Sequence, residues 1–155
     1  MRKFLFHLTL VLLFSCNKPK SECKWDSIPN SLVLKIVKAN QPFTDADLKG
    51  FKLYYFDNNG SKKYLTDLST SQNLTYKEKG LIGTRMIGWL SADDNIKVYY
   101  LESPGLSLDT LFVDYLPRSK ATNCLYIQKP IKVNGNNAQI DTNFHFETPV
   151  FVINK

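Results

Sequence analysis

The amino-acid sequence predicts an all-β protein whose domain is an antiparallel β-sandwich. Short runs rich in β-branched and aromatic residues recur along the chain, and turn residues separate them at intervals of roughly 8–12 residues. No stretch keeps an apolar spacing of about 3.6 residues long enough to predict a major helix. A closed β-barrel is the competing architecture, because it has the same local pattern.

The first predicted strands are apolar runs that end at turn signals. Residues 32–38 predict a strand, and residues 39–50 predict a loop with room for one helical turn. Residues 51–56 and 63–65 predict a hairpin, because the Asp-Asn-Asn-Gly sequence between them tolerates the positive φ of a tight turn.

The later elements follow the same pattern. Residues 81–90 and 96–102 predict a second hairpin across the polar turn at 92–95, and residues 108–116 predict a strand. The remaining predicted elements are strands at 124–128, 131–134 and 149–153 and a turn at 135–137. About seven to nine strands indicate a sandwich that is immunoglobulin-like or prealbumin-like in outline. We expect one domain over residues 31–155.

The N-terminus has the order of a secretory signal. Arg2 and Lys3 precede an apolar run of eleven residues, 4–14, which is shorter than the ~20 residues that a transmembrane helix needs. Leu13-Phe14-Ser15-Cys16 resembles the lipobox of bacterial lipoproteins. An ordinary cleaved signal with a chance cysteine is the alternative.

This resemblance implies a lipid anchor. In the lipoprotein family the cysteine thiol takes a diacylglyceryl group and the signal, here residues 1–15, is removed. Two or three acyl chains such as palmitate hold a protein to a membrane durably, whereas one chain binds reversibly. Residues 16–30 then form a lipidated tether, and Asn17 in place of Asp favours the outer membrane of a Gram-negative envelope.

The charge of the mature chain is modest. Removing Arg2 and Lys3 from the 20 basic residues leaves 18 against 14 acidic residues, a net charge of +4. The lysines are spread along the chain without a long cationic run, which is typical of a solvated surface. Because an exported protein does not meet nucleic acid, we expect none as a partner.

The two cysteines that remain after lipidation of Cys16 predict a disulfide. Cys23 and Cys124 would lie in an oxidising compartment, where thiols commonly pair. A bridge between them closes 101 residues, worth roughly 4–5 kcal/mol in the chain-entropy model. Two separate free thiols are the alternative.

Catalytic and metal-binding patterns are weak. His145 is the only histidine left after signal removal, and no Gly-x-Ser-x-Gly sequence supplies a nucleophile for it. One histidine cannot complete a zinc site, and the run that starts at Asp45 and Asp47 lacks the later ligands of a calcium loop. The adjacent Asp93 and Asp94 are expected to be solvated turn residues. We therefore expect no enzyme, no cofactor and no metal.

Aromatic residues in the strands give the functional hypothesis. Because side chains alternate along a strand, one set must fill the core while another can form an exposed shelf. The candidates for the shelf are Tyr54, Phe56, Trp89 and Tyr99. Such a shelf would serve a protein-interaction or accessory module of an outer-membrane assembly, or alternatively bind a glycan.

Two tripeptides resemble an acceptor pattern for O-glycosylation of exported bacterial proteins. They are Asp26-Ser27-Ile28 and Asp109-Thr110-Leu111. The resemblance implies that Ser27 and Thr110 are possible acceptors, and intact-protein mass spectrometry tests it by the presence or absence of hexose.

Overall fold

A computed structural model describes residues 23, 31–70, 78–116, 118–119, 123–143 and 148–155 of the chain. The predicted signal, the lipidation site at Cys16, the tether apart from Cys23, the Asp26-Ser27-Ile28 tripeptide and His145 lie outside the described residues. Within the described residues, no helix is long and apolar enough to cross a membrane.

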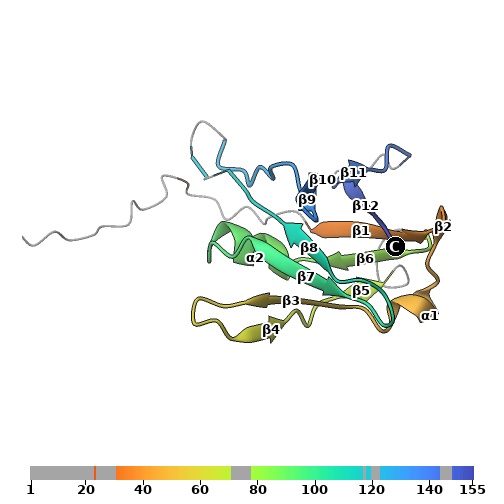
Figure 1. Ribbon diagram of the computed structural model, residues 1–155. Helices are drawn as coiled ribbons and strands as arrows, with labels where there is room; N and C mark the ends of the chain where they lie inside the picture. The colour runs from red at the N-terminus through yellow and green to blue at the C-terminus, as the bar shows by residue number, and fades with distance from the viewer. Residues whose placement is uncertain (1–22, 24–30, 71–77, 117, 120–122, 144–147) are drawn as a thin grey trace, which may run out of the picture.

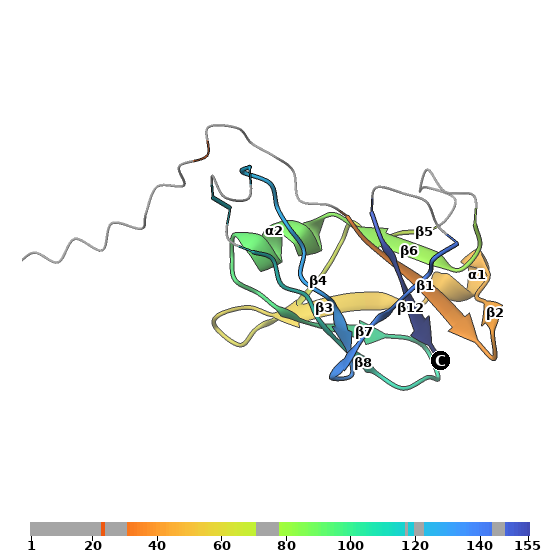
Figure 2. The ribbon, with the colours of Figure 1, turned by 90° about the horizontal axis from the view of Figure 1, so that it is seen from above.

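The described chain forms two sheets that pack as a sandwich, as predicted, and they do not close into a barrel (Figures 1 and 2). The first sheet has the order β11-β12-β1-β6-β5, with β2 paired to β1, and the second has the order β10-β9-β8-β7-β3-β4. The strands of the first sheet are β1 (Leu32–Lys38), β2 (Gln41–Pro42), β5 (Ser69–Thr70), β6 (Leu81–Thr84), β11 (Gln139–Ile140) and β12 (Val150–Asn154). The strands of the second are β3 (Lys52–Phe56), β4 (Lys62–Tyr64), β7 (Val98–Glu102), β8 (Asp109–Phe112), β9 (Lys132–Val133) and β10 (Asn136–Asn137). All pairs are antiparallel except β1 with β12.

The core lies between the two sheets and follows the alternation of strand residues. In β1, Leu32, Leu34 and Ile36 are fully or almost fully buried and belong to the main hydrophobic cluster. Leu53 and Leu101 pair in register in the second sheet and close the cluster from the other side. One face of the second sheet, which includes Leu53 and Leu101, therefore packs in the core, and the opposite face points outward.

The first predicted hairpin is confirmed as β3 and β4. Asp57 Oδ1 accepts hydrogen bonds from the backbone N–H groups of Asn59 and Ser61, both at 2.9 Å. Gly60 has a φ of +76°, a conformation that glycine adopts at no steric cost. The register sets Tyr54 opposite Tyr64 and Phe56 opposite Lys62.

The second predicted hairpin is wrong, because β6 and β7 belong to different sheets. Between them the chain forms a helix, α2 (Met86–Ala92), which buries Ile87 and Ser91. The Asp67 carboxylate accepts hydrogen bonds from the N–H groups of Arg85 at 2.6 Å and Met86 at 2.9 Å. This carboxylate satisfies donors at the helix start that would otherwise lack partners. The connection is a crossover from one sheet to the other.

The expected helical turn in the first loop is present as α1 (Asp45–Leu48). Thr44 and Asp47 form a reciprocal capping box, with Thr44 N–H donating to Asp47 Oδ2 at 3.0 Å. This bond and a side-chain hydrogen bond from Thr44, the larger cause, lower the pKa of Asp47. Asp47, one of the two aspartates of the calcium-like run, therefore has a local structural role.

The C-terminal elements differ from the prediction in detail. Residues 124–128 are not a named strand and make one isolated bridge, between Tyr115 and Gln128. The turn predicted at 135–137 lies at Asn134 and Gly135, so that Asn136 and Asn137 form β10. The strands predicted at 108–116, 131–134 and 149–153 are present in shorter or shifted form as β8, β9 and β12.

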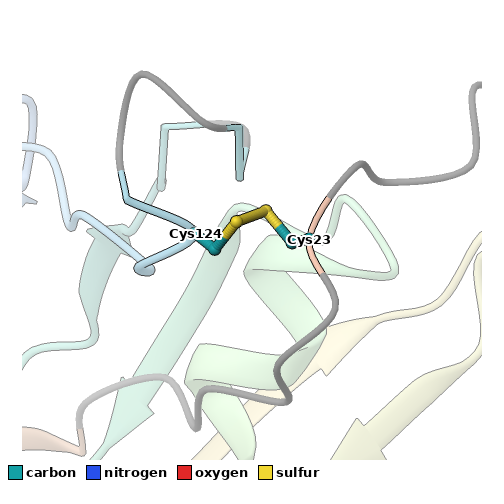
Figure 3. Close-up of a disulfide and its surroundings, with 2 residues drawn as sticks. All are labelled: Cys23 and Cys124. Atoms are coloured by element: carbon teal, nitrogen blue, oxygen red, sulfur yellow. A yellow bond between two sulfur atoms is a disulfide. The ribbon is translucent and has the colours of Figure 1, made fainter.

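The predicted disulfide joins Cys23 to Cys124 (Figure 3). The two Cα atoms are 5.4 Å apart, within the range of ordinary disulfides. Cys124 has a positive φ of 60° and its N–H donates to Ser119 O at 2.9 Å, so it sits in a tight turn. The bridge fastens the chain before β1 to this turn, 101 residues later.

Candidate functional site

The outer face of the second sheet gathers aromatic and aliphatic side chains from three neighbouring strands and the edge strand β4. The register places Tyr64, Tyr54, Tyr100 and Thr110 in one row across β4, β3, β7 and β8. The adjacent row contains Val98, Phe112 and Lys132. Because opposite residues share a face, these side chains all point away from the core. We call this surface, made of Tyr54, Phe56, Tyr64, Val98, Tyr100 and Phe112, the outer aromatic face.

Most of the outer aromatic face is open to solvent. Phe56 is 47% exposed, Tyr64 46%, Val98 40% and Phe112 38%. Tyr54 lies at its centre and is covered by its neighbours. A contiguous apolar surface of this kind on a small domain is typical of a binding site.

The rings of this face pack against one another. Tyr54 and Tyr100 are stacked, with centroids 5.0 Å apart and planes 16° apart. Phe56 meets Tyr100 edge to face at 5.6 Å, and Tyr64 meets Tyr54 at 5.6 Å. The Lys62 ammonium lies 3.7 Å from the Tyr54 ring centroid, a cation–π contact. The rings of Tyr54 and Tyr100 in the centre are therefore in contact with each other and, for Tyr54, with the Lys62 ammonium.

Two shallow hollows flank Val98 on the outer aromatic face. One, of about 210 Å³, is lined by Phe56, Tyr100 and the polar residues Asn58 and Asn95 among others. The other, of about 280 Å³, is lined by Val98, Thr110, Phe112, Lys132 and Gly135. Thr110 of the second acceptor-like tripeptide therefore lies on this face, while its neighbour Asp109 is buried.

Of the four predicted shelf residues, Phe56 is on the outer aromatic face and exposed, and Tyr54 is on it but buried. The prediction for Tyr99 is wrong, because Tyr99 is completely buried in the core. Its hydroxyl donates to Ile96 O at 2.7 Å and shares a hydrogen bond with Ser91 Oγ at 2.8 Å. Burial raises the pKa of Tyr99. Alternation along β7 puts its neighbour Tyr100 on the outer face in its place.

Trp89 is exposed, but it belongs to α2 and to a different site. Its ring centroid is 6.0 Å from that of Tyr126, which in turn contacts Tyr115 and the Arg118 guanidinium. Tyr126 follows Cys124 by two residues, so this aromatic group lies beside the disulfide. Figures 1 and 2 show α2 and the segment around residues 123–128 at the same end of the molecule. We call this the disulfide end.

A cavity of about 330 Å³ opens at the disulfide end. Asp114 in its wall is almost fully buried and pairs with Lys97 at 3.0 Å and Lys129 at 2.5 Å. Burial opposes ionisation of Asp114, but hydrogen bonds from Lys129 and Lys97 outweigh it and lower its pKa. Tyr126 donates to Asp93 at 3.1 Å, and burial raises the pKa of Tyr115 to about 12. Asp114, Lys97 and Lys129 are thus already paired with one another.

The sequence predicts that the adjacent aspartates Asp93 and Asp94 are solvated turn residues. Asp93 and Asp94 are both exposed at the end of α2, as predicted for solvated residues. Among the residues that the structure describes, no group of three or more histidine, cysteine or acidic side chains is placed to hold a metal ion.

Sequence reasoning missed Tyr64, Val98 and Phe112 as members of the exposed face. The alternation of side chains in residues 96–102 indicated that Val98 shares a face with Tyr100. The alternation alone does not indicate which of the two faces of that strand is buried.

Comparison of the chain with family models, with curated proteins and with solved structures finds no match. The two-sheet fold and the outer aromatic face therefore carry the functional argument.

Proposed function

We propose that this protein is a lipid-anchored module of the outer membrane that docks a partner protein through the outer aromatic face. The anchor follows from the lipobox-like Leu13-Phe14-Ser15-Cys16, whose cysteine would carry the acyl chains. The observation that supports docking is the exposure of Phe56, Tyr64, Val98 and Phe112 on one continuous sheet face.

The packing of the rings favours a protein partner over a sugar. Sugars stack on aromatic faces that are open to solvent. Here Tyr54 and Tyr100 stack on each other, and Lys62 covers Tyr54. The exposed part of the face is made by Phe56, Tyr64, Phe112 and the aliphatic side chain of Val98, a surface suited to the apolar centre of a protein interface.

The charges around the face indicate the chemistry of the partner. Lys52 and Lys132 are exposed on it, and Lys62, on the edge strand β4, reaches over Tyr54 with Glu102 3.4 Å from its ammonium. A rim of lysines around an apolar centre complements a surface with apolar residues and an acidic border. The proposed partner is therefore an envelope protein with such a patch.

A glycan is the second candidate ligand for the same face. The hollow beside Val98 combines Phe56 and Tyr100 with the amides of Asn58 and Asn95. Ring surface together with amide donors and acceptors is a suitable lining for a saccharide.

The test is cross-linking in intact cells followed by purification of the tagged protein. Wild type is compared with Cys16→Ala, with a face variant, Val98→Ser/Phe112→Ser, and with a control, Ile140→Ser. Ile140 is at least as exposed as Val98 and Phe112 but lies on the other sheet. We expect stoichiometric capture of one envelope protein by wild type and control, and loss of capture in the other two.

Capture that persists in the face variant contradicts docking through this face. If nothing specific is captured by the wild type, the glycan candidate is tested instead, by titrating the purified protein with envelope and dietary glycans.

A further inference from the structure

Exposed aliphatic side chains gather on the disulfide end. Tyr115 pairs with Gln128, and next to them Leu116 N–H donates to Ile127 O at 2.8 Å. Tyr115 belongs to the core, so the opposite pair, Leu116 and Ile127, points outward. They are 39% and 42% exposed, and Leu125, between Cys124 and Ile127, is 53% exposed.

Trp89 adds an aromatic side chain to the same end. It is exposed on α2 and its ring contacts Tyr126, which packs on Tyr115, so Trp89 borders the other side of this segment from Leu125 and Ile127 at the same end of the domain. Tryptophan and tyrosine have an apolar ring and one polar hydrogen-bonding group, which suits them to the boundary between lipid and water.

The charges at this end leave no strong field of either sign. Lys97 and Lys129 both pair with Asp114, and the exposed Asp93 and Asp94 offset the remaining lysine charge and the Arg118 guanidinium. A surface of exposed leucine, isoleucine and tryptophan with balanced charges is attracted to lipid by burial of apolar area. Its affinity for lipid should therefore depend little on salt.

The disulfide fixes which end of the domain the proposed anchor holds. The seven residue steps from Cys16 to Cys23 span at most about 25 Å, even fully extended. Cys23 is bonded to Cys124 at the disulfide end. Without the bridge, the segment that joins Cys16 to the first strand would have sixteen residue steps, from Cys16 to Leu32, and could span up to about 58 Å.

We infer that the disulfide end rests on the lipid bilayer, with Leu116, Leu125, Ile127 and Trp89 in the interface between headgroups and acyl chains. This inference rests on the proposed lipid at Cys16 for its geometry, while the apolar patch is an independent observation. The partner of the outer aromatic face must then present its own patch close to the membrane.

Quenching of tryptophan fluorescence by brominated lipid tests this orientation. The lipidated full chain is purified with Trp25→Phe, which leaves Trp89 as the remaining one of two tryptophans. It is reconstituted in phosphatidylcholine vesicles with and without bromine on the acyl chains. We expect brominated lipid to lower Trp89 emission at least about twofold. We expect Leu125→Ser/Ile127→Ser to remove most of this quenching, and the control Leu108→Ser/Ile140→Ser to keep it.

Two results overturn the inference: Trp89 emission that brominated lipid leaves unchanged, or equal quenching in the test and control variants. The mass of the purified chain separates this test from the proposed anchor. If Cys16 carries no lipid, the anchor is refuted, and excess vesicles are added to the same protein. An affinity for vesicles roughly tenfold lower in the test variant than in the control then supports the patch, and equal affinity overturns it.

Discussion

Replacing Lys155 tests a buried ion pair that joins the two sheets. The Lys155 side chain follows β12 and is completely buried, where its ammonium pairs with Oδ2 of Asp109 at the start of β8. It also donates to Ser107 O at 2.6 Å. Asp109 Oδ1 accepts a hydrogen bond from Asn134 Nδ2 at 2.8 Å, and Oδ2 pairs with the Lys155 ammonium.

Lys155→Met would leave the Asp109 carboxylate buried with one neutral hydrogen-bond partner. Removing one member of a buried pair costs about 3 kcal/mol or more, because the remaining charge is neither hydrated nor neutralised. For a domain of this size that lowers the urea midpoint by about 2 M. The exposed Lys132→Met is the control, with an expected change below about 0.5 kcal/mol.

Asp109→Asn combined with Lys155→Met should recover more than half of the loss, because the neutral amide can still accept from Asn134. Urea unfolding followed by circular dichroism measures all three variants. A cost below about 1 kcal/mol for Lys155→Met, or a double variant no more stable than the single one, refutes the reasoning.

Three further predictions concern the fold. Changing Cys23 and Cys124 to serine should lower the free energy of unfolding by roughly 2–4 kcal/mol, because the open chain regains loop entropy; urea unfolding measures it, and an unchanged midpoint contradicts it. Lys35 donates a hydrogen bond of 2.7 Å to Asp141, and this bond lowers the pKa of the Asp141 carboxyl. Burial opposes the charge of Lys35, but the same bond outweighs burial and raises the pKa of Lys35. A lowered carboxyl pKa stabilises the fold above about pH 4 and less as the pH falls below it. The free energy of unfolding of wild type should exceed that of Lys35→Met by about 0.5–1 kcal/mol near pH 7, and this difference should shrink at pH 3. A difference that is the same at both pH values would contradict this prediction. Tyr99→Phe should cost about 1–2 kcal/mol in urea unfolding, because it removes the buried hydroxyl that bonds Ile96 O and Ser91 Oγ; a neutral change would show that the hydroxyl is dispensable.

The parts of the fold that sequence reasoning predicted are those set by local chemistry. The β3–β4 hairpin followed from its Asp-Asn-Asn-Gly turn, and the structure shows Asp57 and Gly60 in those roles. The disulfide followed from counting, because only Cys23 and Cys124 remain once Cys16 is assigned to lipid.

The parts that failed depend on residues far apart in the sequence. Helix α2 is only seven residues long, and its start is satisfied by Asp67, eighteen residues before Arg85. Strand propensity in residues 81–90 does not reveal that carboxylate. Likewise Tyr99 and Tyr100 are chemically alike, and only the packing of β7 against the first sheet decides which of them is buried.

Site-specific photo-cross-linking in living cells tests docking through the outer aromatic face most directly. A photoreactive amino acid is placed at Phe112 on that face, and in a matched chain at Ile140 on the first sheet, which is similarly exposed. Docking through this face predicts one discrete cross-linked envelope protein from position 112 and none from position 140. The same product from both positions, or no protein product from position 112, would contradict it.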